Sequence, residues 1–163
     1  MLRNCCAALL LMQASIAMAF EERTVDDFAP LASGTSIEEF DAEIRRYEND
    51  CLENSFSGSL GQRCFMKRLL WTRELQRIYP VFEAELPEKM RQAFIEEQQA
   101  WEDTLAQTEL LAKYLIGKQF NEPGTMYITA RAKALDDMMT TPIKQRVTML
   151  REWQQNFLAN QED

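Results

Sequence analysis

Apolar side chains recur at intervals of three and four residues along most of the 163-residue chain, a spacing typical of amphipathic α-helices. The first such stripe follows Ser36 and Glu39, an S-x-x-E pair that forms a capping box at the start of a helix. The pattern predicts a helix over residues 37–53 that buries one face, comprising Ile37, Phe40, Ile44, Tyr47 and Cys51. The glycines and serines of residues 54–61 then predict a loop.

Helical spacing resumes after this loop, with an apolar face comprising Cys64, Trp71, Leu75, Ile78 and Phe82. Proline lacks a backbone N–H and clashes with the carbonyl four residues earlier, so Pro80 predicts that this second helix ends or kinks near Tyr79. Pro87 is well placed as the first residue of a third helix. That helix is expected to end near Ile116, where Gly117 provides a stop signal.

The C-terminal part of the chain predicts two further helices. Thr125 is placed to cap a fourth helix over about residues 126–139. Pro142 is expected to start a fifth, whose core positions are Ile143, Val147, Leu150 and Phe157. No segment shows the alternation of a β-strand, so the sequence predicts an all-α protein.

The N-terminus has the features of a secretory signal. Arg3 precedes an apolar run over residues 5–12, and small residues lead to a predicted cleavage site after Ala19. The alternative, an N-terminal membrane anchor, is disfavoured because Gln13 interrupts an apolar run that is shorter than the roughly 20 residues of a membrane span. We therefore expect a secreted or periplasmic protein with no membrane span after cleavage.

The chain is expected to divide into four segments. Residues 1–19 form the signal peptide, and residues 20–35, which show no sustained periodicity, form an acidic N-terminal extension. A helical domain follows over residues 36–118, and residues 119–160 add C-terminal helices that pack on it.

Two of the four cysteines, Cys5 and Cys6, lie within the predicted signal peptide. In an oxidising compartment the remaining pair, Cys51 and Cys64, is expected to form a disulfide in preference to two free thiols. The sequence thus predicts an antiparallel helical hairpin stapled by one disulfide within a four- to five-helix bundle.

The chain contains no histidine, which removes Ser-His-Asp and Cys-His catalysis and histidine-ligated metal centres. Glycine-rich nucleotide-binding loops are also missing from the sequence. A glycosidase would need two carboxylates in a cleft, and acids are abundant at Glu96, Glu97, Glu102 and Asp103. A run of charges on a helix is usually a solvated face, so we expect no catalytic residue, no metal and no cofactor.

Negative charge is concentrated near the N-terminus. The chain carries a net charge of −8, and residues 20–59 alone contain eleven acidic and three basic residues. This charge disfavours binding to nucleic acid or anionic lipid and favours a basic protein partner. Two arrangements remain open. In the first, these acids stay available to a partner. In the second, Glu43, Glu48 and Asp50 face the basic residues of the second helix, which are Arg63, Lys67, Arg68, Arg73 and Arg77.

A short series of motifs gives the chain a family resemblance over about residues 51–108. After the cysteine pair come the segment ELQRIY (74–79), with Glu74, Leu75 and Tyr79, and the segment QQAW (98–101), with Gln98 and Trp101. In this order they resemble the LprI-type lysozyme inhibitor family of secreted bacterial proteins. The resemblance implies a helical fold and, for some members, inhibition of lysozyme.

The sequence also departs from the family pattern. Gln76 replaces the usual asparagine, Pro80 follows the tyrosine, and no cysteine follows Trp101 to form a second disulfide. Leu75, Tyr79 and Trp101 lie on apolar helix faces and are expected in the core, whereas Glu74 and Gln98 are expected to hydrogen-bond between helices or toward a loop.

Two functions follow as hypotheses. The first is an inhibitor that binds a basic, lysozyme-like cell-wall hydrolase through carboxylates such as Glu38, Asp41 and Glu43. The second is a non-catalytic envelope interaction module that uses the helices after Lys118, with an adaptable groove formed by Met138, Met139, Met149 and Trp153. Ordinary core positions are the alternative for these four side chains.

Overall fold

The computed structural model describes residues 20–31, 34–54 and 58–160, so the predicted signal peptide lies outside it. Within these ranges the chain forms α-helices and short 3₁₀ turns, without a strand. The helices are α1 (Ile37–Asn54), α2 (Lys67–Glu85), α3 (Glu88–Gln119) and α4 (Thr125–Ala159). The prediction of an all-α bundle is confirmed.

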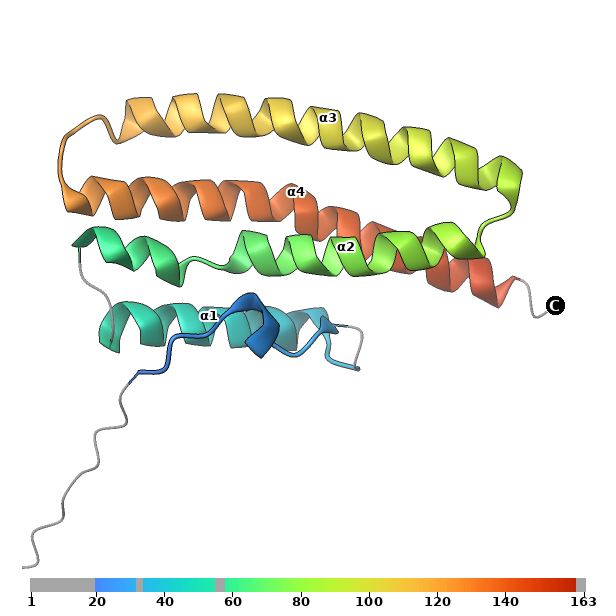
Figure 1. Cartoon of the computed structure of the whole chain (residues 1–163), viewed down its shortest axis with the longest axis horizontal. Helices are drawn as coiled ribbons and strands as arrows, with labels where there is room; N and C mark the ends of the chain where they lie inside the picture. The colour runs from blue at the N-terminus through green and yellow to red at the C-terminus, as the bar shows by residue number, and fades with distance from the viewer. Residues whose placement is uncertain (1–19, 32–33, 55–57, 161–163) are drawn as a thin grey trace, which may run out of the picture.

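Successive helices run in opposite directions along the molecule, with α1 at one side and α3 at the other (Figure 1). Between them α2 and α4 run in the same direction and pack together. The 3₁₀ helix η3 (Gly58–Cys64) continues the line of α2 and contacts both α1 and α4. The α2–α4 pair is therefore the centre of the bundle.

The predicted disulfide is present between Cys51 of α1 and Cys64, and both cysteines are fully buried. Cys64 ends η3 instead of lying within the second helix, which begins only at Lys67. The bond therefore joins the end of α1 to η3, and the antiparallel hairpin consists of α1 on one side and η3 with α2 on the other (Figure 1).

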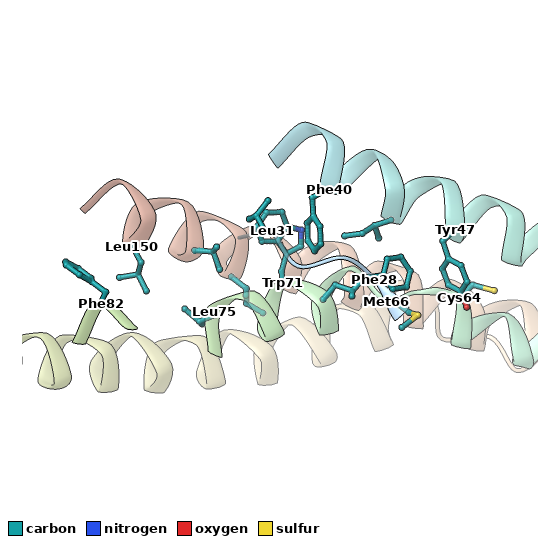
Figure 2. Close-up of a cluster of buried hydrophobic side chains, with 14 of the residues drawn as sticks. Phe28, Leu31, Phe40, Tyr47, Cys64, Met66, Trp71, Leu75, Phe82 and Leu150 are labelled. Carbon is teal, nitrogen blue, oxygen red and sulfur yellow. The ribbon is translucent and has the colours of Figure 1, made fainter. Parts of the chain in front are cut away.

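The core is centred on Trp71, which is fully buried and meets Phe40 of α1 edge to face at 5.2 Å between ring centroids (Figure 2). The described part of the N-terminal extension, residues 20–31, is here called the N-terminal arm. It contributes Phe28 and Leu31 to the same core. The arm is thus an integral part of the fold, although its sequence shows no periodicity.

Neither internal proline ends a helix. α2 continues through Pro80 to Glu85, and α4 continues through Pro142, so the two C-terminal helices that the sequence predicts are one. Each proline leaves one carbonyl without an intrahelical donor, at Gln76 and at Met138. Both of those residues are exposed, so water can satisfy the carbonyls while the apolar face of each helix stays packed.

The helix ends agree with the sequence in part. The capping box is confirmed, because Ser36 Oγ accepts the Glu39 N–H at 3.1 Å and Glu39 Oε2 accepts the Ser36 N–H at 2.9 Å. The N-cap of α4 is Gly124 instead of the predicted Thr125, and its φ of 133° suits glycine. α3 continues past Gly117 to Gln119.

Candidate binding surface

Exposed carboxylates are concentrated on the N-terminal arm and α1. Several of them are exposed and make no salt bridge with a described residue. These are Glu21, Glu22, Asp26, Glu38, Asp50 and Glu53, here called the acidic surface. Exposed acidic side chains grouped in this way attract an approaching cation.

Two further carboxylates near this surface are held by backbone donors. The Ser36 N–H hydrogen bond holds the pKa of Glu39 below its usual range, and the Thr24 N–H does the same for the pKa of Asp27. Both side chains are exposed. They therefore add negative charge to the same region throughout the neutral and mildly acidic range.

The structure separates the three carboxylates that the sequence proposes for partner binding. Glu38 is exposed and belongs to the acidic surface. Asp41 accepts the Trp71 Nε1–H at 3.1 Å and pairs with Lys144 of α4. Glu43 pairs with Arg23 of the arm at 2.8 Å. Asp41 and Glu43 hold elements together, whereas Glu38 makes no ion pair with a described residue.

Three basic residues of the second helix, Lys67, Arg68 and Arg73, pair with groups outside the acidic surface. Lys67 pairs with buried Glu48 at 2.9 Å, which realises one of the contacts that the sequence suggests across the hairpin. Arg68 instead pairs with Glu109 of α3 at 3.1 Å. Arg73 donates to the carbonyl of Phe28 at 3.0 Å and so holds the arm. These three cations therefore do not compensate the acidic surface.

A compact ion-pair network lies where α1, α2 and α4 meet. Lys67 contacts both Glu48 and Asp137, and Lys133 contacts the same two carboxylates. Burial opposes the charge of Lys67, but its hydrogen bonds to Asp137 and Glu48 outweigh this and raise its pKa. Burial likewise opposes ionisation of Asp137, yet bonds from Lys133 and Lys67 lower its pKa. The network joins the three helices.

Asp136 of α4 sits beside this network and accepts the Arg68 N–H at 3.0 Å, at the start of α2. Its second oxygen, Oδ2, is buried and has no hydrogen-bond partner among the described residues. Burial raises the pKa of Asp136, and the nearby charges of Glu48 and Asp137 act in the same direction. Folding therefore disfavours the charged form of Asp136 relative to the unfolded chain.

Asp136→Asn is expected to raise the free energy of unfolding at pH 7 by up to about 1 kcal/mol, because the amide keeps an acceptor for Arg68 without a buried charge. A group whose pKa is raised on folding stabilises the protein below its unfolded pKa and loses that contribution as the pH rises. The advantage over the wild type should therefore vanish below about pH 4.

Urea denaturation at both pH values measures this difference. Asp136→Ala serves as the matched control and is expected to cost about 1–2 kcal/mol, since the Arg68 N–H loses its acceptor. Equal losses for the asparagine and alanine variants at pH 7 would contradict the assignment of a buried, disfavoured charge.

The residues of the family resemblance all contact neighbouring elements. Buried Glu74 accepts the Leu31 N–H of the arm at 3.2 Å, and Leu75 lies in the core. Tyr79 stacks on the Phe94 ring of α3 with 5.0 Å between centroids. Glu74 thus ties α2 to the arm, and Tyr79 ties it to α3.

Gln98 and Trp101 of α3 surround a buried cation that sequence reasoning missed. Arg146 of α4 donates two hydrogen bonds to Gln98 Oε1, at 3.0 and 2.7 Å, and pairs through both terminal nitrogens with Glu97. Its guanidinium lies 5.5 Å from the Trp101 ring centroid and 5.9 Å from that of Trp153. A signal for it exists in the sequence, because Arg146 interrupts the apolar stripe of α4.

The side chains proposed for a C-terminal groove do not line one site. Met139 is buried in a small cluster with Ala112 and Ile116 of α3. Met149 lines a cleft between α1 and α4, whereas Trp153 is 42% exposed and borders a separate apolar groove of about 400 Å³. That groove lies at the end of the bundle, between α4 and the α2–α3 turn, and includes Phe82, Leu86, Met90, Phe94 and Phe157.

Among the described residues, no cluster of three metal-ligating side chains is found. No helix there has an apolar run of the length that crossing a membrane would require. A buried disulfide in such a molecule is compatible with an extracellular or periplasmic location.

No protein-family model matches the chain, and neither the curated proteins nor the solved structures compared with it show a match. The LprI-type resemblance therefore depends on the short motifs alone.

Proposed function

We propose that the protein is an exported, non-catalytic binding protein that inhibits a basic cell-wall hydrolase of the lysozyme class. The observation that carries the proposal is the acidic surface, whose carboxylates are exposed and have no described cationic partner. The family resemblance supplies the class of target. No residue is assigned a catalytic role.

The acidic surface suits recognition of a cationic partner on physical grounds. Opposite net charges accelerate encounter between proteins, by tenfold to a thousandfold at low ionic strength, and suppress binding to acidic competitors. Exposed carboxylates stay hydrated in the free protein, so a desolvation cost arises only when the complex forms. The inhibitor is thus expected to owe much of its association rate, and its selectivity for basic hydrolases, to charge.

A lysis assay tests the proposal. The protein, exported by an expression host and purified, is expected to slow the lysis of cell walls by at least one basic lysozyme at low salt. A variant with Glu22, Glu38 and Glu53 all changed to Gln should associate about tenfold more slowly. The control changes Glu96, Glu122 and Glu152 to Gln, which alters net charge equally outside the acidic surface.

Two results would oppose the proposal. Undiminished lysis by every basic lysozyme at large molar excess of the protein removes the inhibitor function. Equal slowing of association by the two triple variants shows that net charge alone acts, and it removes the assignment to the acidic surface.

A second candidate function is a non-catalytic envelope interaction module that uses the apolar groove beside Trp153. Half-exposed Trp153 favours it, since aromatic side chains at the edge of an apolar groove are typical of protein contacts.

Truncation after Lys118 does not test this second function, because α4 supplies core residues Ile143, Val147 and Leu150. Trp153→Ser, compared with the wild type in co-purification from envelope extracts, is the better experiment, and identical partners for both proteins would count against this function.

A further inference from the structure

Three large apolar side chains gather on the outer face of the C-terminal half of α3. Leu110, Leu111 and Tyr114 are 61%, 57% and 63% exposed. They lie on a stripe that begins at Asp103 and ends at Lys118, with Gln107 between, here called the α3 stripe. On the opposite side of the helix, Ala112 and Ile116 pack against α4.

Within the described part of the chain, the position of α3 leaves this stripe unpartnered. α3 is the outermost helix on its side of the bundle, and no described element covers its outer face (Figure 1). Large apolar side chains gathered on one helix face in this way mark interaction surfaces in soluble proteins. We infer that the occupant is a second copy of the same chain, paired with the first through the α3 stripe in antiparallel orientation.

The sequence of the stripe is complementary to itself when reversed. An antiparallel pair with its two-fold axis between Leu110 and Leu111 places these leucines against each other. The same register places Gln107 opposite Tyr114 and Asp103 opposite Lys118, and each contact occurs twice. A parallel pair would instead set Asp103 against Asp103 and Lys118 against Lys118, which repel.

The charged ends of the stripe are free to form these pairs. Among the described residues, Asp103 accepts a single hydrogen bond, from Gln99 within its own helix, at 3.1 Å. The Lys118 ammonium lies 5.6 Å from the Tyr114 ring centroid, also within the helix. Both side chains are exposed, so exchanging these local contacts for an intermolecular pair costs little.

Pairing through α3 is compatible with the net charge of −8. α1 and the N-terminal arm lie on the opposite side of the bundle from α3, so the acidic surfaces of the two copies would point away from each other (Figure 1). The contact spans residues 103–118, roughly 22 Å of helix. A single helix pair of this length belongs to the smaller, weaker class of interfaces.

Sedimentation over about 1–200 µM protein tests the pairing without any hydrolase, so its outcome is independent of the proposed function. The wild type is expected to shift from monomer to dimer across this range. Leu111→Glu should abolish the dimer, whereas Leu69→Glu, a matched change at an exposed position of α2, should leave it intact. Thermal unfolding followed by circular dichroism verifies that both variants fold.

A charge exchange tests the register. Asp103→Lys and Lys118→Asp, made singly, should each weaken dimerisation by about tenfold, because each sets like charges opposite each other. The double variant D103K/K118D should restore the wild-type dimerisation constant. A wild type that stays monomeric throughout, a dimer that Leu111→Glu leaves unchanged, or a double variant weaker than either single change would each overturn the inference.

Discussion

Arg146→Ala is expected to lower the free energy of unfolding by about 3–4 kcal/mol. The Arg146 side chain is 1% exposed and fills the space between the Trp101 and Trp153 rings. Its removal leaves a cavity and takes away both donors to Gln98 Oε1 in a buried site. Chemical denaturation of the purified variant measures the loss.

A matched variant separates packing from charge. Glu97 is the ionic partner of Arg146, but its side chain is 47% exposed, so Glu97→Gln should cost about 1 kcal/mol or less. Arg146→Met keeps the apolar stem and should lose less stability than Arg146→Ala. If Glu97→Gln destabilised the protein as much as Arg146→Ala, the ion pair and not the buried packing would be the main contribution.

Loss of the Cys51–Cys64 disulfide is expected to lower the free energy of unfolding by about 3 kcal/mol. The bond closes a loop with a sequence separation of 13 and joins α1 to η3 in a fully buried position. The double variant C51S/C64S also places two hydroxyl groups in the core, which adds to the cost.

Thermal unfolding with and without a reductant measures this contribution. Reduction should lower the Tm of the wild type toward that of C51S/C64S and leave the double variant unchanged. A wild type whose Tm is the same in the presence of reductant, with free thiols demonstrated by titration, would contradict a stabilising role for the bond.

Helix positions could be predicted from the sequence because apolar periodicity and capping are local. The stripe of α1 and the Ser36–Glu39 capping box needed no information from elsewhere in the chain. The two internal prolines do not end their helices, because the effect of a proline depends on context. The carbonyls of Gln76 and Met138, which lose their donors to the two prolines, are at exposed positions. Packing of the apolar face therefore keeps each helix continuous.

The burial of the N-terminal arm had no local signal. Phe28 and Leu31 enter the core because Glu74 accepts the Leu31 N–H and Arg73 binds arm carbonyls, more than 40 residues away in the sequence. An irregular segment has no period from which its buried positions can be inferred. Burial of the arm therefore depends on its contacts with the packed helices and could not be predicted from its own sequence.

The candidate partner-binding residues illustrate the same limit. Charge counting located the acidic region correctly at residues 20–59, but it did not distinguish free from committed carboxylates. Asp41 is held by Trp71 and Lys144, and Glu43 by Arg23, whereas Glu38 makes no ion pair with a described residue. These partners come from other elements, so only the three-dimensional arrangement assigns them.

The most direct test of contact-based inhibition is a calorimetric titration of the purified protein with a basic lysozyme at about 20 mM and about 150 mM salt. The acidic surface predicts a complex of fixed stoichiometry at low salt whose affinity falls at the higher salt, together with slowed lysis. The absence of a complex at low salt, with lysis undiminished in excess protein, would contradict the proposed function.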